Sequence, residues 1–299
     1  MVFDSPTEIR VSTGRLDLAA RRWGNPDGEP ILAVHGWLDN GASYDFLLPH
    51  FDLDRYQVVA LDLPGHGWSD HRPPGESYHL LEYVRDIVAA AENLGWTEYR
   101  LMGHSLGGSL TMLVACAYPE RVRQLVLLDA LGPLTGAEQD GPSLLRQALD
   151  KSIQGSSAMA SYPNIETAIA ARQKGIGALS REAAAAIVTR NVQQAETGVQ
   201  WRTDPRLRWP SYQRMTEGQA AEYLKAIQCP TLLLAGEQGM LKPGNPRLES
   251  RLACIRNLRL EYVAGAHHLH MEPRPDLVAG LIMGFYGEQG ASASKASML

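Results

Sequence analysis

A serine lies at the centre of the pentapeptide Gly103-His104-Ser105-Leu106-Gly107, which has the form G-x-S-x-G. A short apolar stretch precedes it, and a run of helix-forming residues follows it as far as Pro119. A strand, a sharp turn and a helix are the context of a nucleophile elbow, where the strained turn exposes the serine hydroxyl. The flanking glycines lack a Cβ, so the strand and the helix can pass close together. The flanking pattern therefore predicts Ser105 as a nucleophile, whereas the bare pentapeptide would fit a helix N-cap equally well.

A serine hydroxyl is a weak nucleophile until a base takes its proton. The candidate base lies in the segment Gly265-Ala266-His267-His268-Leu269-His270, which follows the last expected strand. We favour His267, because the small residues directly before it allow the loop to turn back towards Ser105. His268 and His270 are its competitors. The cluster lacks further ligands at metal-binding spacing, so we expect neither a metal nor a cofactor.

The base needs a carboxylate that fixes its tautomer and stabilises the imidazolium. Asp129 ends the apolar run 125–128, and Glu237 follows the apolar run 232–236. Both residues satisfy the chain order nucleophile, acid, histidine that accompanies an elbow. We favour Asp129 and keep Glu237 as the alternative.

Acyl transfer also requires N–H donors that stabilise the oxyanion of the tetrahedral intermediate. One expected donor is the backbone N–H of Leu106, directly after the nucleophile, and the other should come from the loop after an earlier strand. The stretch Val34-His35-Gly36-Trp37 follows such a strand, and Gly36 lets the chain turn sharply. We therefore expect Trp37 to supply the second N–H.

Alternating strands and helices must position these residues. Apolar runs at 31–34, 56–61, 100–102, 124–128, 231–235 and 258–263 predict strands that are buried on both faces. An opening hairpin is expected over 8–11 and 16–22, and helices over 43–50, 78–94, 106–118 and 275–286. This alternation predicts right-handed crossovers and a mostly parallel sheet, formed by residues 1–130 and 228–287.

The interval 131–227 interrupts the alternation, because it contains no convincing strand. Helical pieces are expected at 143–153, 165–173, 181–192 and 217–227. A structureless loop of this length would be implausible, so the interval predicts an inserted helical cap. Residues 288–299 are small and polar, which predicts a disordered tail. The tripeptide Ser297-Met298-Leu299 resembles a peroxisomal signal only loosely, and we assign it no role.

Bulk composition excludes several classes of protein. The chain has 299 residues, of which 44% are hydrophobic and 20% charged, and a formal net charge of −5. A nucleic-acid-binding protein would carry a basic stripe, so we expect no such partner. No apolar run reaches the roughly 20 residues of a membrane span, and the start lacks the pattern of a signal peptide. The three cysteines have no metal-like spacing, so we expect reduced thiols and a cytoplasmic protein; oligomeric state is not readable from the sequence.

Together these stretches resemble the α/β-hydrolase fold family, and most closely its serine hydrolase-like proteins and small bacterial carboxylesterases. Three further segments carry the resemblance: Asp62 to Ser69 as D-x-P-G-x-G-x-S, Tyr118 to Val122 as Y-P-E-x-V, and His267 to Glu272 as H-x-x-H-x-E. The match covers about 7–130 and 228–286. It implies an α/β fold with an eight-stranded sheet, an inserted cap, and His267 as the base.

The resemblance also bears on the acid. The commonest acid of the family follows the glycine that ends the seventh strand by three residues, and here that position is Gly239. Some relatives instead carry the acid at the end of the sixth strand, where this chain has Asp129. The resemblance therefore favours Asp129 over Glu237, which is two positions out of register.

We therefore expect a serine hydrolase that cleaves small esters with an apolar moiety. Carbon–carbon bond hydrolases and cofactor-free perhydrolases use the same triad and remain alternatives, as does a non-catalytic binding protein on this fold. Dehalogenases and epoxide hydrolases require a carboxylate at position 105 and are disfavoured. Apolar pockets are rich in aromatic residues, and the candidates for this pocket are Trp37, Trp68, Trp201, Trp209 and Tyr212.

Overall fold

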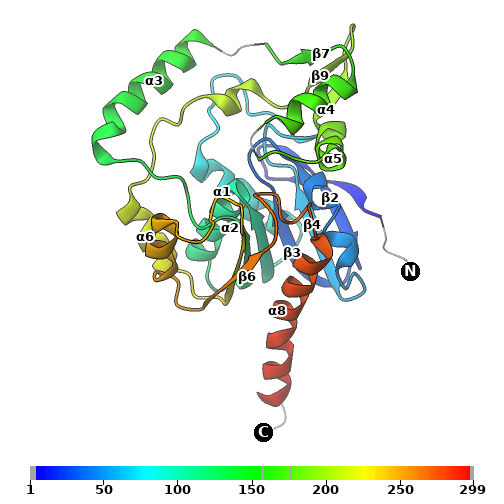
Figure 1. Ribbon diagram of the computed structural model, residues 1–299, viewed down its shortest axis with the longest axis vertical. Helices are drawn as coiled ribbons and strands as arrows, with labels where there is room; N and C mark the ends of the chain where they lie inside the picture. Colours follow the sequence, from blue (N-terminus) through cyan, green and yellow to red (C-terminus); the bar gives the residue numbers. More distant parts are fainter. Residues whose placement is uncertain (1–4, 156–157, 176, 297–299) are drawn as a thin grey trace.

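An eight-stranded, mostly parallel sheet lies at the centre of the protein (Figure 1). The computed structural model describes residues 5–155, 158–175 and 177–296, with side chains as far as Glu288. The strand order is β1-β2-β4-β3-β5-β6-β10-β11, and only β2 runs antiparallel to its neighbours. The strands are β1 (Thr7–Ser12), β2 (Asp17–Gly24), β3 (Glu29–Val34), β4 (Tyr56–Leu61), β5 (Tyr99–His104), β6 (Val122–Leu128), β10 (Thr231–Gly236) and β11 (Leu258–Val263). The α/β fold with a mostly parallel eight-stranded sheet is thus confirmed.

Helices cover both faces of the sheet, because its inner strands are apolar on both sides. Alternate residues of β3 separate the two cores: Leu32 and Val34 pack on one face, and Ile31 and Ala33 on the other. Helices of the first face are α1 (Leu80–Asn93), α2 (Leu106–Ala117), α6 (Glu217–Lys225) and α7 (Pro246–Leu252). The second face is covered by the 3₁₀ turns η1 (Gly41–Tyr44) and η2 (Leu48–His50) and by α8 (Pro275–Ala296).

Two local predictions differ from the structure. The helix expected over 43–50 is instead the pair of 3₁₀ turns η1 and η2, and Pro49 falls inside the second turn. Proline lacks the N–H that an α-helix needs in its interior, so the segment cannot continue as one helix. Helix α7 was not anticipated, because its seven residues carry too short an apolar pattern.

The insertion between β6 and β10 forms a cap with its own apolar core, which includes Ile169, Leu179, Ile187 and Val188. Its elements are η3 (Glu138–Asp140), α3 (Gly141–Gln154), β7 (Ser161–Tyr162), α4 (Ile165–Gln173), α5 (Arg181–Asn191), β8 (Val192–Gln194), β9 (Val199–Trp201) and η4 (Pro205–Arg208). The three short strands form a small sheet in the order β7-β9-β8, although the interval was expected to lack strands. Strands of two or three residues are too short for an alternating pattern to reveal.

Helix α6 lies within the interval expected as cap, yet Leu224 packs in the core beneath the sheet. Figure 1 shows α6 beside α2, whereas α3 stands apart from the sheet and α4 and α5 lie together on the other side of the cap. The cap that lies over the sheet therefore consists chiefly of α3 to η4.

At the C-terminal end, α8 continues to Ala296, through most of the segment where we expected a disordered tail. The segment contains several alanines, which have the highest helix propensity, and the prediction did not weigh this. Residues 297–299, and with them the Ser-Met-Leu tripeptide, lie outside the described residues. Within the described ranges, no helix is both long and apolar enough to cross a membrane.

Candidate active site

Ser105 occupies a strained turn between β5 and α2, as the G-x-S-x-G pattern predicts. Its φ is 52° and its ψ is −115°, a conformation that residues with a Cβ rarely adopt. The flanking glycines are required by close backbone contacts. A Cβ on Gly107 would lie 1.9 Å from the Val34 carbonyl oxygen, and one on Gly103 would lie 2.4 Å from the Gly107 carbonyl oxygen. The serine backbone is strained because α2 returns directly over the end of the sheet.

A chain of hydrogen bonds joins Ser105, His267 and Asp129. His267 Nε2 lies 2.9 Å from Ser105 Oγ, and His267 Nδ1 lies 2.6 Å from Asp129 Oδ2. Both His267 and Asp129 are buried, whereas Ser105 is partly exposed. The structure therefore brings together the three residues that we expected to act as base, acid and nucleophile.

The backbone around Asp129 holds its carboxylate firmly. Asp129 follows the end of β6 and has a φ of 47°, and its carboxylate accepts the N–H of Met240 at 2.8 Å. Weaker bonds of 3.3 Å come from the N–H groups of Gly236 and Leu241. The segment after β10 therefore surrounds the acid with donors.

Glu237, the alternative acid, is exposed at the start of that same segment. Its N–H donates to the Val263 carbonyl oxygen at 3.0 Å, which directs the residue along the edge of the sheet. In the described part of the chain, no hydrogen bond or ion pair joins its carboxylate to His267. The geometry thus favours Asp129, as the sequence did.

Trp37 and Leu106, the expected oxyanion donors, lie on two segments that touch. Gly107 contacts the end of β3, and a Cβ on Gly36 would lie 2.8 Å from His104 Nδ1. The N–H of Leu106 has no partner within α2, because Leu106 is the first residue of that helix. Among the residues that the structure describes, no backbone acceptor takes the N–H of Trp37. Both N–H groups thus lack a backbone acceptor in the described structure and lie on segments that contact one another.

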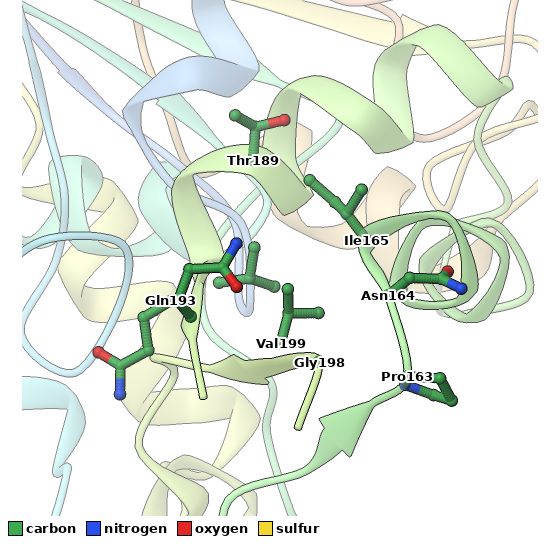
Figure 2. Close-up of a pocket in the computed structure, with 9 residues that line it drawn as sticks. Pro163, Asn164, Ile165, Thr189, Gln193, Gly198 and Val199 are labelled. Atoms are coloured by element: carbon green, nitrogen blue, oxygen red, sulfur yellow. The ribbon is translucent and has the colours of Figure 1, made fainter. Parts of the chain in front are cut away.

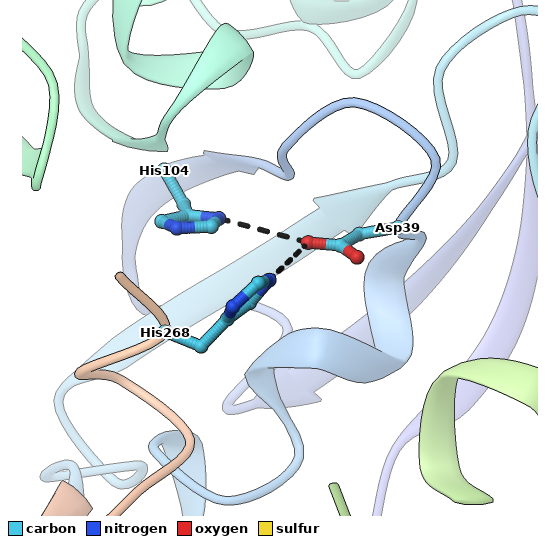
Figure 3. Close-up of side chains that lie close together, drawn as sticks. All are labelled: Asp39, His104 and His268. Atoms are coloured by element: carbon cyan, nitrogen blue, oxygen red, sulfur yellow. Dashed lines mark hydrogen bonds and ion pairs between the residues drawn. The ribbon is translucent and has the colours of Figure 1, made fainter. Parts of the chain in front are cut away.

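A second buried cluster lies next to His267 and was not anticipated (Figure 3). Asp39 Oδ2 lies 3.1 Å from His268 Nε2 and 3.7 Å from His104 Nδ1, so these three groups could hold a metal ion. However, the guanidinium of Arg172 in α4 already donates to Asp39 Oδ1 at 2.8 Å. Burial would raise the pKa of the Asp39 carboxyl, but His268 and Arg172 hold it well below its usual value. The cluster thus has the chemistry of an internal ion pair.

His270, the second histidine of the H-x-x-H-x-E motif, is buried and has no hydrogen-bond partner in the described structure for either ring nitrogen. Its ring packs against Tyr44 and His104, with centroids 5.4 and 4.3 Å away. Glu272, which ends the motif, accepts the N–H of Ser180 in the cap at 3.1 Å. Only the first histidine of the motif contacts Ser105, and the other positions serve packing and cap contact.

The five aromatic pocket candidates have different surroundings. Trp37 is half-buried, and its indole N–H donates to the Leu207 carbonyl oxygen at 3.1 Å. Trp68 is exposed and packs on Arg190, whose guanidinium carbon lies 4.4 Å from the ring centroid. Trp201 packs against Tyr162 within the cap.

Trp209 and Tyr212 are half-buried in the connection between η4 and α6. Trp37 thus lies on the loop that carries an expected oxyanion donor, whereas Trp68 and Trp201 pack against residues of the cap.

Two open hollows, each of about 480 Å³, occur elsewhere on the molecule. One lies in the cap between the start of α4, the end of α5 and the small sheet (Figure 2), where Pro163, Thr189 and Val199 contribute to its wall. The other lies between β11 and α8 and includes Tyr262 and Leu277. Neither hollow is lined by Ser105 or His267, so we do not assign the substrate to them.

Comparison with known proteins places this geometry in context. The sequence model of the family described as alpha/beta hydrolase fold matches residues 29–273. A serine hydrolase-like protein of Dictyostelium discoideum is 32% identical over 277 residues, which is 88% of this chain and 77% of that protein.

Solved structures show the same similarity. A hypothetical protein of Pseudomonas aeruginosa is 38% identical with a TM-score of 0.89, over 94% of this chain and 99% of that chain. A thioesterase domain from the curacin biosynthetic pathway is 27% identical with a TM-score of 0.83, over 93% and 99% of the two chains.

Proposed function

Because this chain belongs to the α/β-hydrolase family, we propose that it is a serine hydrolase that cleaves carboxylic esters through an acyl-enzyme intermediate. The relatives' names support a hydrolase. The observation that carries the finer proposal is the hydrogen-bonded chain from Ser105 Oγ through His267 to Asp129, with contacts of 2.9 and 2.6 Å. Such a chain lets a serine hydroxyl lose its proton as it attacks a carbonyl carbon.

In the first half of the proposed reaction, Ser105 Oγ attacks the ester carbonyl while His267 Nε2 takes the hydroxyl proton. Asp129 accepts a hydrogen bond from the Nδ1–H of His267, which keeps Nε2 free to act as the base. The N–H groups of Trp37 and Leu106 donate to the oxyanion as it forms. His267 then gives its proton to the leaving alcohol, and the acyl group remains on Ser105.

In the second half, water takes the position of the alcohol. His267 removes a proton from this water, which attacks the acyl carbon, and then returns the proton to Ser105 Oγ as the carboxylic acid leaves. Each step uses groups of this chain and water. An apolar moiety in the substrate stays a prediction, which the half-buried Trp37 and Leu38 of the loop after β3 favour.

Thioester hydrolysis is the second candidate, because the same acyl transfer cleaves a thioester. The observation that favours it is the similarity to the curacin-pathway thioesterase domain, with 27% identity and a TM-score of 0.83. Carbon–carbon bond hydrolysis and perhydrolysis use the same residues, and no observed contact favours either.

The proposal is tested with nitrophenyl esters of increasing acyl length and with matched acyl thioesters, on wild type, Ser105→Ala, Asp129→Asn and Glu237→Gln. We expect a fluorophosphonate probe to label wild type but not Ser105→Ala. Asp129→Asn should lower kcat by roughly 10²–10⁴-fold, and the exposed control Glu237→Gln should change it less than about twofold.

Three results would count against parts of this proposal. Loss of activity in Glu237→Gln with Asp129→Asn unaffected would reverse the choice of acid. Turnover of a vinylogous diketone without turnover of any ester would favour a carbon–carbon bond hydrolase. A wild-type protein that the probe does not label would favour a non-catalytic binding protein.

A further inference from the structure

Four consecutive residues after β3, the 37–40 loop, are each hydrogen-bonded to the cap. The first of them, Trp37, is a proposed oxyanion donor. The bonds run from Trp37 Nε1 to Leu207 O (3.1 Å), from Asn191 Nδ2 to Leu38 O (3.2 Å), from Arg172 Nη2 to Asp39 Oδ1 (2.8 Å) and from Asn40 Nδ2 to Ile187 O (2.9 Å). The cap partners come from η4, from α4 and from both the middle and the end of α5. No two loop residues share a cap partner, so the cap holds the loop at four separate points.

The backbone of this loop contains a strained residue, which neighbouring groups must hold in place. Leu38 has a φ of 65°, which lies in the left-handed region that residues with a Cβ disfavour. A strained residue persists only where its surroundings impose its conformation. Asn191 bonds to the carbonyl oxygen of Leu38 itself, so a cap side chain fixes the peptide unit directly after the strained residue.

The contact between Arg172 and Asp39 is the strongest of the four by charge and burial. The side chain of Asp39 is 1% exposed and that of Arg172 is 10% exposed. A hydrogen bond between charged groups is about twice as strong as one between neutral groups. Asp39 also contacts His268, the residue after the proposed base. Arg172 Nη2 itself lies 3.3 Å from His268 Nε2, so one cap arginine contacts both the 37–40 loop and the segment of the proposed base.

We infer that the cap positions the oxyanion donor, and that Arg172 is a positioning residue which acts through Asp39 on the backbone of Trp37. The inference rests on the proposed function for its kinetic consequence. Without the four contacts, the loop would relax from the strained Leu38 conformation. The Trp37 N–H would then no longer point towards the oxyanion. Misplacement of such a group by about 1 Å can lower the rate 10²-fold.

The cap has a separate attachment that makes this testable. Arg190 in α5 binds Asp62 after β4, with Nε 2.8 Å from Oδ2 and side chains that are 5% and 0% exposed. This ion pair does not involve the 37–40 loop. Removal of Arg172 should therefore loosen the loop while the cap stays docked.

The test compares Arg172→Gln and Arg172→Lys with the control Arg181→Gln. Arg181 is another cap arginine, and its ion pair with Glu166 is exposed. We expect Arg172→Gln to lower kcat roughly tenfold or more while KM changes less than about threefold. Affinity for a trifluoromethyl ketone, whose adduct with Ser105 carries an oxyanion, should fall by a similar factor. Arg172→Lys should recover part of the loss, and Arg181→Gln should match wild type.

The rate of hydrogen–deuterium exchange in the segment 36–44 reports how firmly the loop is held, and it needs no substrate. We expect faster exchange in Arg172→Gln, and in Trp37→Phe, which removes the indole N–H donor and keeps an aromatic ring, although a smaller one. Unchanged exchange in both variants would overturn the inference even if activity fell. A loss confined to KM would also overturn it, because the cap would then act on substrate binding alone. If the wild type hydrolyses nothing, the proposed function fails and exchange alone decides the inference.

Discussion

Gly239 lies directly against the carboxylate of Asp129: a Cβ added to it would be 2.5 Å from Oδ1 and 2.6 Å from Oδ2. The residue position that carries the acid in many members of the family thus lies against Asp129, the side chain that we propose as the acid here. Two carboxylates could not both fit there, and their like charges would also repel. The lack of a side chain at residue 239 and the presence of Asp129 are therefore one structural feature.

This relationship predicts that the acid can be moved. Asp129→Gly should lower kcat by roughly 10²–10⁴-fold. Addition of Gly239→Asp to that variant should restore at least about tenfold of the loss, because the new side chain starts within reach of His267 Nδ1. Gly239→Asp alone should be inactive or poorly folded. The measurement is kcat for a nitrophenyl ester, with circular dichroism to check folding.

The matched control for this exchange is Asp129→Gly with Gln238→Asp, which adds a carboxylate at the adjacent, exposed residue. Equal recovery in both double variants would mean that any nearby negative charge suffices. No recovery with Gly239→Asp would show that the backbone after β10 cannot present an acid to His267.

The residues around Ser105 could be predicted from the sequence because their constraints are local. A glycine two residues before and after the serine is demanded by backbone contacts within a few ångströms, so the requirement appears as a short motif. The choice of Asp129 followed from the end of a recognisable apolar strand. Such features need only the order of residues along one strand, turn and helix.

The contacts between cap and core could not be predicted in this way. Arg172 meets Asp39 across 133 residues of chain, and nothing in the surrounding alanine-rich helix marks it. The exposed pocket candidate Trp68 packs on Arg190 of α5, a contact that the sequence does not reveal. These pairings depend on how the cap docks on the core, and hydrophobic periodicity along the chain does not predict that arrangement.

The backbone contacts at the elbow predict opposite effects for two glycine substitutions. Gly107→Ala should destabilise the protein by about 3 kcal/mol or more, because its Cβ would overlap a backbone oxygen that cannot move aside. Gly284→Ala in α8 should stabilise it by about 0.5–1 kcal/mol, because the helix is exposed there and a Cβ meets nothing within 4 Å. Urea unfolding of both variants tests this, and similar values for the two would contradict the elbow geometry.

The buried ion pair that docks α5 predicts a large stability effect. Asp62 accepts hydrogen bonds from the N–H groups of Gly41 and Trp68 as well as from Arg190. Arg190→Leu would leave the carboxylate of Asp62 buried without a counter-charge, which should lower the free energy of unfolding by about 3–5 kcal/mol. The exposed pair of Arg181 with Glu166 offers the comparison, since Arg181→Leu should cost at most about 1 kcal/mol. A small effect of Arg190→Leu in chemical unfolding would show that α5 is held mainly by its apolar contacts.

Buried histidines predict that the protein loses stability in acid. Burial lowers the pKa of both His66 and His270 to about 3, from an ordinary value of 6.5. Between these values the unfolded chain binds protons that the folded chain does not, so stability falls as the pH falls from about 6.5 towards 3. Each such histidine contributes a slope of about 1.4 kcal/mol per pH unit in that window. Asp45 acts in the opposite direction, because burial raises its pKa to about 6.

His270→Phe isolates one of these contributions. The histidine ring packs against Tyr44, His104 and His268, and neither of its nitrogens has a partner in the described structure, so an apolar ring can take its place. The free energy of unfolding, measured by urea titration from pH 4 to pH 7, should then depend on pH less steeply by about 1.4 kcal/mol per unit below pH 6. His50→Phe, on the exposed end of η2, controls for the loss of a histidine as such. An unchanged slope in His270→Phe would mean that this ring becomes charged inside the folded protein, and the cluster beside His267 would then have to accommodate that charge.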